Sequence, residues 1–98
     1  MLKGYWIARV DVHDAENYKS YIAANAAALN KYGARFLVRA GRFHCPEGQA
    51  RQRNIVLEFP SYQAAHDCWY SPEYQAAIAH RAPFSTGDFV IIEGYEPG

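Results

Sequence analysis

An alternation of side-chain types over residues 5–12 restricts the fold of this chain more than any other pattern in it. One parity of positions is wholly apolar and the other mixes apolar with charged residues: Trp6, Ala8, Val10 and Val12 against Tyr5, Ile7, Arg9 and Asp11. A period of two residues is that of a β-strand. Because both faces of this strand carry apolar side chains, the sheet that contains it must be covered on both sides.

A long helix is predicted to follow this strand. Residues 15–32 are rich in Ala, and their apolar side chains recur at helical spacing. Asp14 can cap the N-terminus, and Gly33 suits the first position beyond the C-terminus. The pattern therefore predicts a helix bounded by these two residues.

Three further strands and a broken second helix complete the predicted order. Strand-like runs occupy three ranges: 35–40, 54–59 and 88–95. Between the last two, Ser61 begins a short helix, and Ser71 followed by Pro72 begins another. The order β-α-β-β-α-β predicts an α+β fold, the ferredoxin-like sandwich with one four-stranded antiparallel sheet.

The helices of such a fold can cover only one face of the sheet, and the other face is also partly apolar. In residues 35–40, for example, alternation places Phe36 and Val38 opposite Leu37 and Arg39. A domain of 98 residues buries only roughly 60–65% of its unfolded surface, so association would add to its stability. We therefore expect a homodimer in which a second copy packs on the open face, sheet to sheet.

Charge and cysteine content restrict the functional classes. Ten basic and ten acidic residues balance, and no run of Lys or Arg occurs, which argues against nucleic-acid or membrane-surface binding. No apolar stretch approaches the ~18 residues of a membrane span, and the start lacks a signal-peptide pattern. Cys45 and Cys68 form no C-x-x-C motif. We expect one domain over residues 1–98, in the cytoplasm, with reduced thiols.

The most specific pattern lies between Arg53 and Tyr74. Residues 53–61 read R-N-I-V-L-E-F-P-S, and residues 69–74 read W-Y-S-P-E-Y. With Arg81 and the R-A-G of residues 39–41, they resemble a widespread bacterial family of unknown function in the dimeric α+β barrel superfamily. This resemblance covers nearly the whole chain, although Ala40 stands where the family more often has Gly.

The resemblance implies a two-subunit barrel and no particular reaction. Relatives in the superfamily include antibiotic-biosynthesis-monooxygenase-like and EthD-like proteins, lactone isomerases, stress-induced domains and haem proteins. In these relatives the site usually lies between the sheet and the helices of one subunit.

Three arginines at motif positions, Arg39, Arg53 and Arg81, are candidate substrate-binding residues. A guanidinium is expensive to bury without a partner, and it grips carboxylates through paired hydrogen bonds. One interpretation is therefore a clamp for a carboxylate or enolate. The alternative is a structural ion-pair network, with three acidic residues as possible partners: Glu58, Glu73 and Asp88.

Aromatic and histidine residues supply the other candidates. Tyr18 and Tyr74 fall on the inward stripes of their helices, where a phenol could act as an acid or hold an oxyanion. Trp69 is expected to line the same pocket, and ordinary core packing is the alternative for all three. His44, near the expected cavity mouth, is a candidate general base. Haem ligation by His80 is a remote alternative, since no histidine pair has metal-ligand spacing.

Two functions fit these residues. The first is a cofactor-independent enzyme acting by proton transfer on a small carboxylated or carbonyl substrate, with His44 and Tyr74 as catalytic residues. The second is a non-catalytic homodimer that binds a small ligand or responds to stress. Neither requires a cofactor or a metal. Convergence of His44, Tyr74 and Arg53 on one cavity would favour the enzyme.

Overall fold

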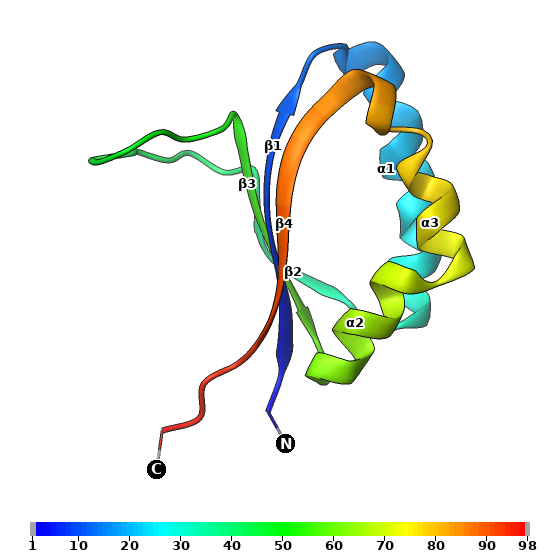
Figure 1. Ribbon diagram of the computed structural model, residues 1–98, viewed down its shortest axis with the longest axis vertical. Coiled ribbons are helices and arrows are strands. Elements are labelled where there is room, and N and C mark those ends of the chain that lie inside the picture. The colour runs from blue at the N-terminus through cyan, green and yellow to red at the C-terminus, as the bar shows by residue number, and fades with distance from the viewer. Residues whose placement is uncertain (1, 98) are drawn as a thin grey trace.

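In the computed structural model, which describes residues 2–97, four strands form one antiparallel sheet with three α-helices on one of its faces (Figure 1). The strands, in the order β2-β3-β1-β4, are β1 (Gly4–Val12), β2 (Arg35–Arg39), β3 (Arg53–Phe59) and β4 (Ser85–Glu93). The helices are α1 (Ala15–Lys31), α2 (Tyr62–Tyr70) and α3 (Pro72–Ile78), and a 3-10 turn, η1 (Ala82–Phe84), precedes β4. The predicted order β-α-β-β-α-β is confirmed.

Helix starts follow the predicted caps. The side chain of Asp14 accepts a hydrogen bond from the Asn17 amide at the start of α1, and Ser61 and Ser71 cap α2 and α3 in the same way. Gly33 has φ 72° just after α1, a conformation that glycine adopts without steric cost. Within residues 2–97, no helix combines the length and the apolar content that crossing a membrane requires.

Trp6 lies at the centre of the core between the sheet and the helices. It is 1% exposed, and its indole Nε1 donates a 2.8 Å hydrogen bond to the carbonyl of Ala65 in α2. Its ring centroid lies 5.0 Å from that of Phe59, 5.5 Å from Trp69 and 4.8 Å from Tyr74. Of the two faces of β1 that the alternation separates, the one with Trp6, Ala8 and Val10 therefore packs against the helices.

Strand β2 contains a bulge that corrects its predicted alternation. Phe36 pairs with Leu57 and Val38 pairs with Val56, so β2 uses one more residue than β3 over this step. As a result, Phe36 and Val38 lie on opposite faces, and Arg39 shares the helix side with Phe36. Ala40, with φ 55°, then turns the chain in a region of backbone space that favours glycine.

Strand β4 was predicted over residues 88–95, but it runs from Ser85 to Glu93. Its pairing extends along the whole of β1, as far as Val12 opposite Ser85. A β-carbon on Gly87 would lie 3.0 Å from the Arg9 carbonyl oxygen, so a glycine suits this close approach. The prediction was wrong at this end because backbone pairing with β1, not side-chain type, sets where the strand begins.

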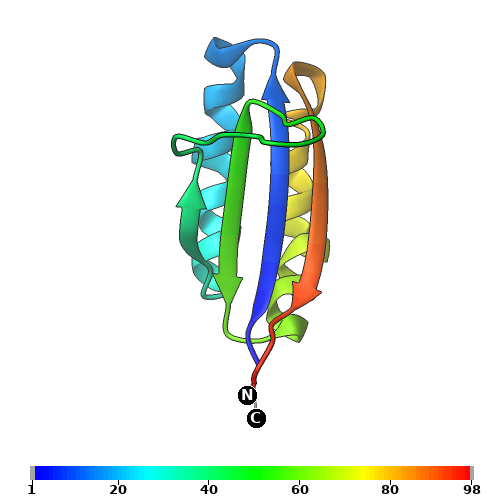
Figure 2. The ribbon, with the colours of Figure 1, turned by 90° about the vertical axis from the view of Figure 1, so that its left-hand side faces the viewer.

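The sheet face opposite the helices is open, and it carries half-exposed apolar side chains: Ile7, Val38, Val90 and Ile92. Residues 40–52, which we call the strap, rise from this face and pass in front of β3 and β1 towards β4 (Figures 1 and 2). Residues 41–50 are all exposed.

Candidate functional site

A cleft opens between α1 and the sheet, where β1 ends and β3 begins. Its outer part has a volume of about 360 Å³, and a narrower inner cavity has about 30 Å³. Tyr18, Ile22 and Arg53 line both parts, so we call this site the Tyr18–Arg53 cleft. The inner cavity holds roughly one water, whereas the outer part lies at the small end of the range for ligand pockets.

The inner cavity is lined by both apolar and polar residues. The apolar lining comes mainly from aromatic and branched side chains: Trp6, Phe36, Ile55, Leu57 and Phe89. The polar lining consists of hydrogen-bond donors and an amide: Tyr18, Tyr21, Asn25, Arg39 and Arg53. Of the residues that line either part, all within the described 2–97, none is a histidine or an acid.

Arg53 reaches the cleft because of its register in the sheet. It pairs with Val10, which is buried on the helix side, so its side chain lies on that side too. Its guanidinium carbon lies 5.8 Å from the centroid of the Tyr18 ring, and its Nε is buried without a hydrogen-bond partner. A buried polar group without a partner is uncommon and costly, which makes this atom notable.

Arg39 and Arg81 occupy different places. Arg39 stacks over Phe36, with its guanidinium carbon 4.1 Å from the ring centroid, and lines the inner cavity. Arg81 follows α3, and its guanidinium carbon lies 4.5 Å from the Phe89 centroid and 5.9 Å from that of Trp69. Its Nε is also buried without a partner. Arg81 and Trp69 therefore lie together, but behind the cleft rather than on its lining.

The ion-pair network considered as the alternative for these arginines does not form. Each of its possible partners binds another basic residue: Glu58 binds Arg35 at 3.3 Å, Glu73 binds Lys31 at 2.8 Å, and Asp88 binds Arg51 at 2.8 Å. In the described part of the chain, no ion pair includes Arg39, Arg53 or Arg81. The site thus has guanidinium groups without counter-ions.

Tyr18 supplies a phenol to both parts of the cleft. Burial raises the pKa of Tyr18, with a further rise from Tyr21, and the nearby guanidinium groups of Arg53 and Arg81 oppose this rise. The phenol therefore stays neutral at physiological pH and can donate a hydrogen bond.

Tyr74 lies in the core, not in the cleft. It is fully buried, and its hydroxyl shares a 2.7 Å hydrogen bond with that of Tyr21. Burial raises the pKa of Tyr74 well above its ordinary value, and Tyr21 adds to this rise. Its inward stripe was read correctly from the sequence, but that stripe faces Trp6 rather than a cavity.

His44 lies on the exposed strap and lines neither part of the cleft. It therefore does not meet Arg53 or Tyr74, and the convergence that would favour a proton-transfer enzyme is not seen. Within the described chain, no three His, Cys, Asp or Glu side chains gather as a metal-binding group.

Sequence reasoning missed Asn25, Lys19 and Gln52 as cleft residues. Asn25 could have been found, because it follows Tyr18 by seven residues and therefore lies two turns along the same face of α1. Gln52 carried no such signal, since its place depends on the path of the strap.

Comparison with other proteins adds a family and a shared fold. Residues 3–95 match the family described as "Domain of unknown function (DUF1330)". A comparison with curated proteins gives no match. Among solved structures, methylated RPA0582 is 17% identical with a TM-score of 0.77, over 99% of this chain and 84% of that one. The unmodified RPA0582 is described as a protein of unknown function from Rhodopseudomonas palustris.

Two further structures share the fold. SnoaB, a cofactor-independent oxygenase from Streptomyces nogalater, is 13% identical with a TM-score of 0.64, over 99% of this chain and 97% of that one. An EthD family protein from Bacillus halodurans is 11% identical with a TM-score of 0.54, over 99% and 100% of the two chains. At such identities the likeness shows the fold alone.

Proposed function

Since the chain belongs to the DUF1330 family, whose members share a domain of unknown function, we propose from its cleft that it binds a small organic anion between Tyr18 and Arg53. The observation that carries this proposal is the Arg53 guanidinium, whose Nε is buried without a hydrogen-bond partner, on the lining of a cleft without acidic residues. A carboxylate placed there would accept paired hydrogen bonds from Arg53 and one from the neutral Tyr18 phenol.

The size and lining of the outer cleft indicate the kind of anion. Its volume of about 360 Å³ suits a small molecule, and the inner cavity is too small for more than one or two heavy atoms. Val12, Ala15 and Ile22 offer apolar contacts, and Lys19, whose ammonium pairs with Glu16 at 3.0 Å, also lines this part. The ligand is therefore a small acid with an apolar body.

Catalysis on the same anion is the second candidate. It is favoured by the fold shared with SnoaB, which is described as a cofactor-independent oxygenase, and by a neutral phenol beside an arginine, which can stabilise an oxyanion. His44 and Tyr74 remain predicted catalytic residues. Because neither lines the cleft, we place binding first and assign any proton transfer in the cleft to Tyr18.

A thermal-shift screen with pairs of carboxylic acids and their amides tests the anion site. An acid at a hundred times its dissociation constant should stabilise the protein by about 2.7 kcal/mol, because it binds only the folded state. For a domain of this size, that raises Tm by roughly 10 °C or more. The matched neutral amide should have little effect at the same concentration. If every acid behaves like its amide, the cleft is not an anion site.

We infer that a second copy of the chain covers the open face. The apolar side chains of Ile7, Val38 and Val90 lie there at 42–50% exposure, between two groups of charged residues. Self-complementary contact of such a face with its own copy is the commonest way to cover it. The strap rises from the same face, so it would also contact the second copy (Figure 1).

Light scattering at micromolar concentration should therefore give twice the chain mass of 11.1 kDa. Ile7→Lys places a charge at the centre of the open face and should yield a monomer. Tyr70→Lys is the control, because Tyr70 is a large exposed side chain (63%, against 42% for Ile7) that belongs to α2 and not to the open face. A monomeric wild-type protein, or a dimer that Ile7→Lys leaves intact, would contradict the proposed interface.

We also infer that the protein works in a reducing compartment such as the cytoplasm. Both cysteines are free, with Cys45 exposed on the strap and Cys68 buried. Burial raises the pKa of Cys68 to about 12, so this thiol stays protonated and unreactive in the folded protein.

A further inference from the structure

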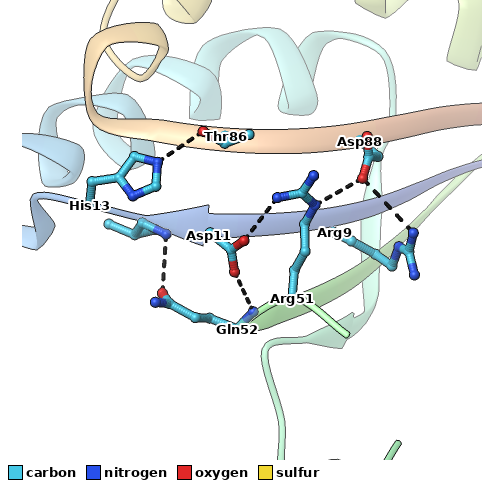
Figure 3. A network of polar contacts seen from close by, with 8 residues as sticks. Arg9, Asp11, His13, Arg51, Gln52, Thr86 and Asp88 are labelled. Carbon is cyan, nitrogen blue, oxygen red and sulfur yellow. Dashed lines mark hydrogen bonds and ion pairs between the residues drawn. The ribbon is translucent and has the colours of Figure 1, made fainter. Parts of the chain in front are cut away.

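A set of polar contacts pins the C-terminal end of the strap to the sheet (Figure 3). The Gln52 amide donates to Asp11 Oδ1 at 2.8 Å, and the Val12 amide donates to Gln52 Oε1 at 3.1 Å. Arg51 Nη1 donates to Asp11 Oδ2 at 2.8 Å. We call Asp11, Arg51 and Gln52 the clamp.

The clamp begins where the backbone pairing of β1 with β3 stops. That pairing ends at Val10 opposite Arg53. One residue further along β1, the side chain of Asp11, instead of the β1 backbone, accepts the hydrogen bond from the Gln52 amide. The clamp thus extends the contact between β1 and the strap by side-chain hydrogen bonds, directly before Arg53.

A bend at Gln52 separates Asp11 and Arg51, on the open face, from Arg53 on the cleft side, and Gln52 itself lines the outer part of the cleft. Asp11 neighbours the buried Val10 in β1, so its side chain lies on the open face, where it meets Arg51. Residues two apart in an extended chain share a face, but the bend sends Arg53 to the helix side. The position of Arg53 in the cleft therefore depends on how the preceding two residues are held.

No hydrogen bond of its own fixes the Nε of Arg53, which is buried without a partner. Its side chain contacts the Tyr18 ring at 5.8 Å, a distance that permits attraction but sets no single orientation. What remains to hold Arg53 is its backbone, through the pairing with Val10 on one side and the clamp on the other.

We propose that Asp11, from the open face, is a positioning residue that holds Arg53 for anion binding in the cleft. The proposal rests on the proposed anion site for its ligand. It couples the open face to the cleft, because a change at Asp11 alters how Gln52 is held and therefore the position of Arg53 at the start of β3.

Matched truncations test this role. Asp11→Ala removes the acceptor of the Gln52 amide and one of the two carboxylates that bind Arg51. Asp88→Ala removes the other carboxylate, which lies 2.8 Å from Arg51, and leaves the hydrogen bond between Gln52 and Asp11 in place. Outer-shell partners of binding residues change affinity by about 10- to 100-fold in metal sites, so we expect Asp11→Ala to weaken carboxylate binding by about tenfold. Asp88→Ala should change it less than twofold. Asp11→Asn keeps an acceptor for Gln52 and should recover part of the affinity.

A purely structural role for Asp11 would give different results. Positioning predicts that Asp11→Ala lowers affinity for an acid more than for its amide, and that it has no further effect in an Arg53→Met background. Equal losses in Asp11→Ala and Asp88→Ala, or an undiminished loss in the Arg53→Met background, would overturn the proposal.

The Nε–H resonance of Arg53 reports on the clamp without any ligand. In the free protein, Asp11→Ala should speed the exchange of this proton with water, while Asp88→Ala should leave it unchanged. If wild-type protein binds no acid but this difference is found, the proposed function fails and the positioning of Arg53 stands. If acids bind and the resonance does not respond to Asp11→Ala, only the positioning role is wrong.

Discussion

Replacing Trp6 by alanine is expected to lower the free energy of unfolding by about 3–5 kcal/mol, the range for truncating a large buried aromatic residue. The indole is 1% exposed and packs against Phe59, Trp69 and Tyr74. Its loss also leaves the Ala65 carbonyl, which accepts from Nε1 at 2.8 Å, without that donor. Because domains are stable by only about 5–15 kcal/mol, the variant should be close to unfolding.

Urea unfolding followed by circular dichroism measures this loss. Trp6→Phe keeps much of the buried area but cannot donate to Ala65, so it should fall between wild type and Trp6→Ala. Tyr95→Ala is the control, since Tyr95 is 88% exposed and surface substitutions usually change stability by less than about 0.5 kcal/mol. If Trp6→Ala unfolds at the same urea concentration as Tyr95→Ala, the core is not organised around the indole.

The grouping of Trp6 with Ala8 and Val10 on one face of β1 could be predicted because its signal is local, whereas the choice of the face that meets the helices could not. The alternation in β1 assigns a parity to every side chain, and pairing with a long β3 and β4 preserves that parity. The starts of the helices could be predicted too, since the side chains of Asp14, Ser61 and Ser71 each accept a hydrogen bond from an amide only three residues away.

Features that depend on pairing between distant strands could not be read in this way. The bulge between Phe36 and Val38 is a mismatch in length between β2 and β3, and it brings Arg39 onto the ring of Phe36. The bend at Gln52 likewise depends on Asp11, forty-one residues away in the sequence. Local alternation carries no information on either contact.

The candidate site was predicted in part for the same reason. Tyr18, Arg39 and Arg53 were candidates from their motif positions and inward stripe, but only the structure places them together on the lining of the cleft. Tyr74 lies on an inward stripe too, but a stripe shows only that a side chain is inside, not whether it meets a cavity or the core. The distance of His44 from the cleft is set by the strap, whose path has no periodic signal.

Arg53→Met should weaken carboxylate binding and at the same time stabilise the free protein. Truncating one member of a buried charge pair costs about 2–5 kcal/mol of binding, so affinity for an acid should fall at least thirtyfold. In the free protein, the substitution removes a buried Nε without a partner, which costs about 1–3 kcal/mol. The attraction to the Tyr18 ring that is lost amounts to about 0.5–1 kcal/mol. The balance favours the variant by about 1 kcal/mol.

Denaturant unfolding without ligand measures the change in stability, and titration with an acid measures the change in affinity. Both are compared between the wild-type protein and Arg53→Met. Arg42→Met is the matched control, since Arg42 lies exposed on the strap and lines neither part of the cleft, so both quantities should stay near wild type. A residue kept against the stability of the free chain points to a ligand, because selection for stability alone would replace it. If Arg53→Met instead destabilises the free protein and leaves acid binding intact, the guanidinium serves the packing around Tyr18, and the anion must be sought elsewhere.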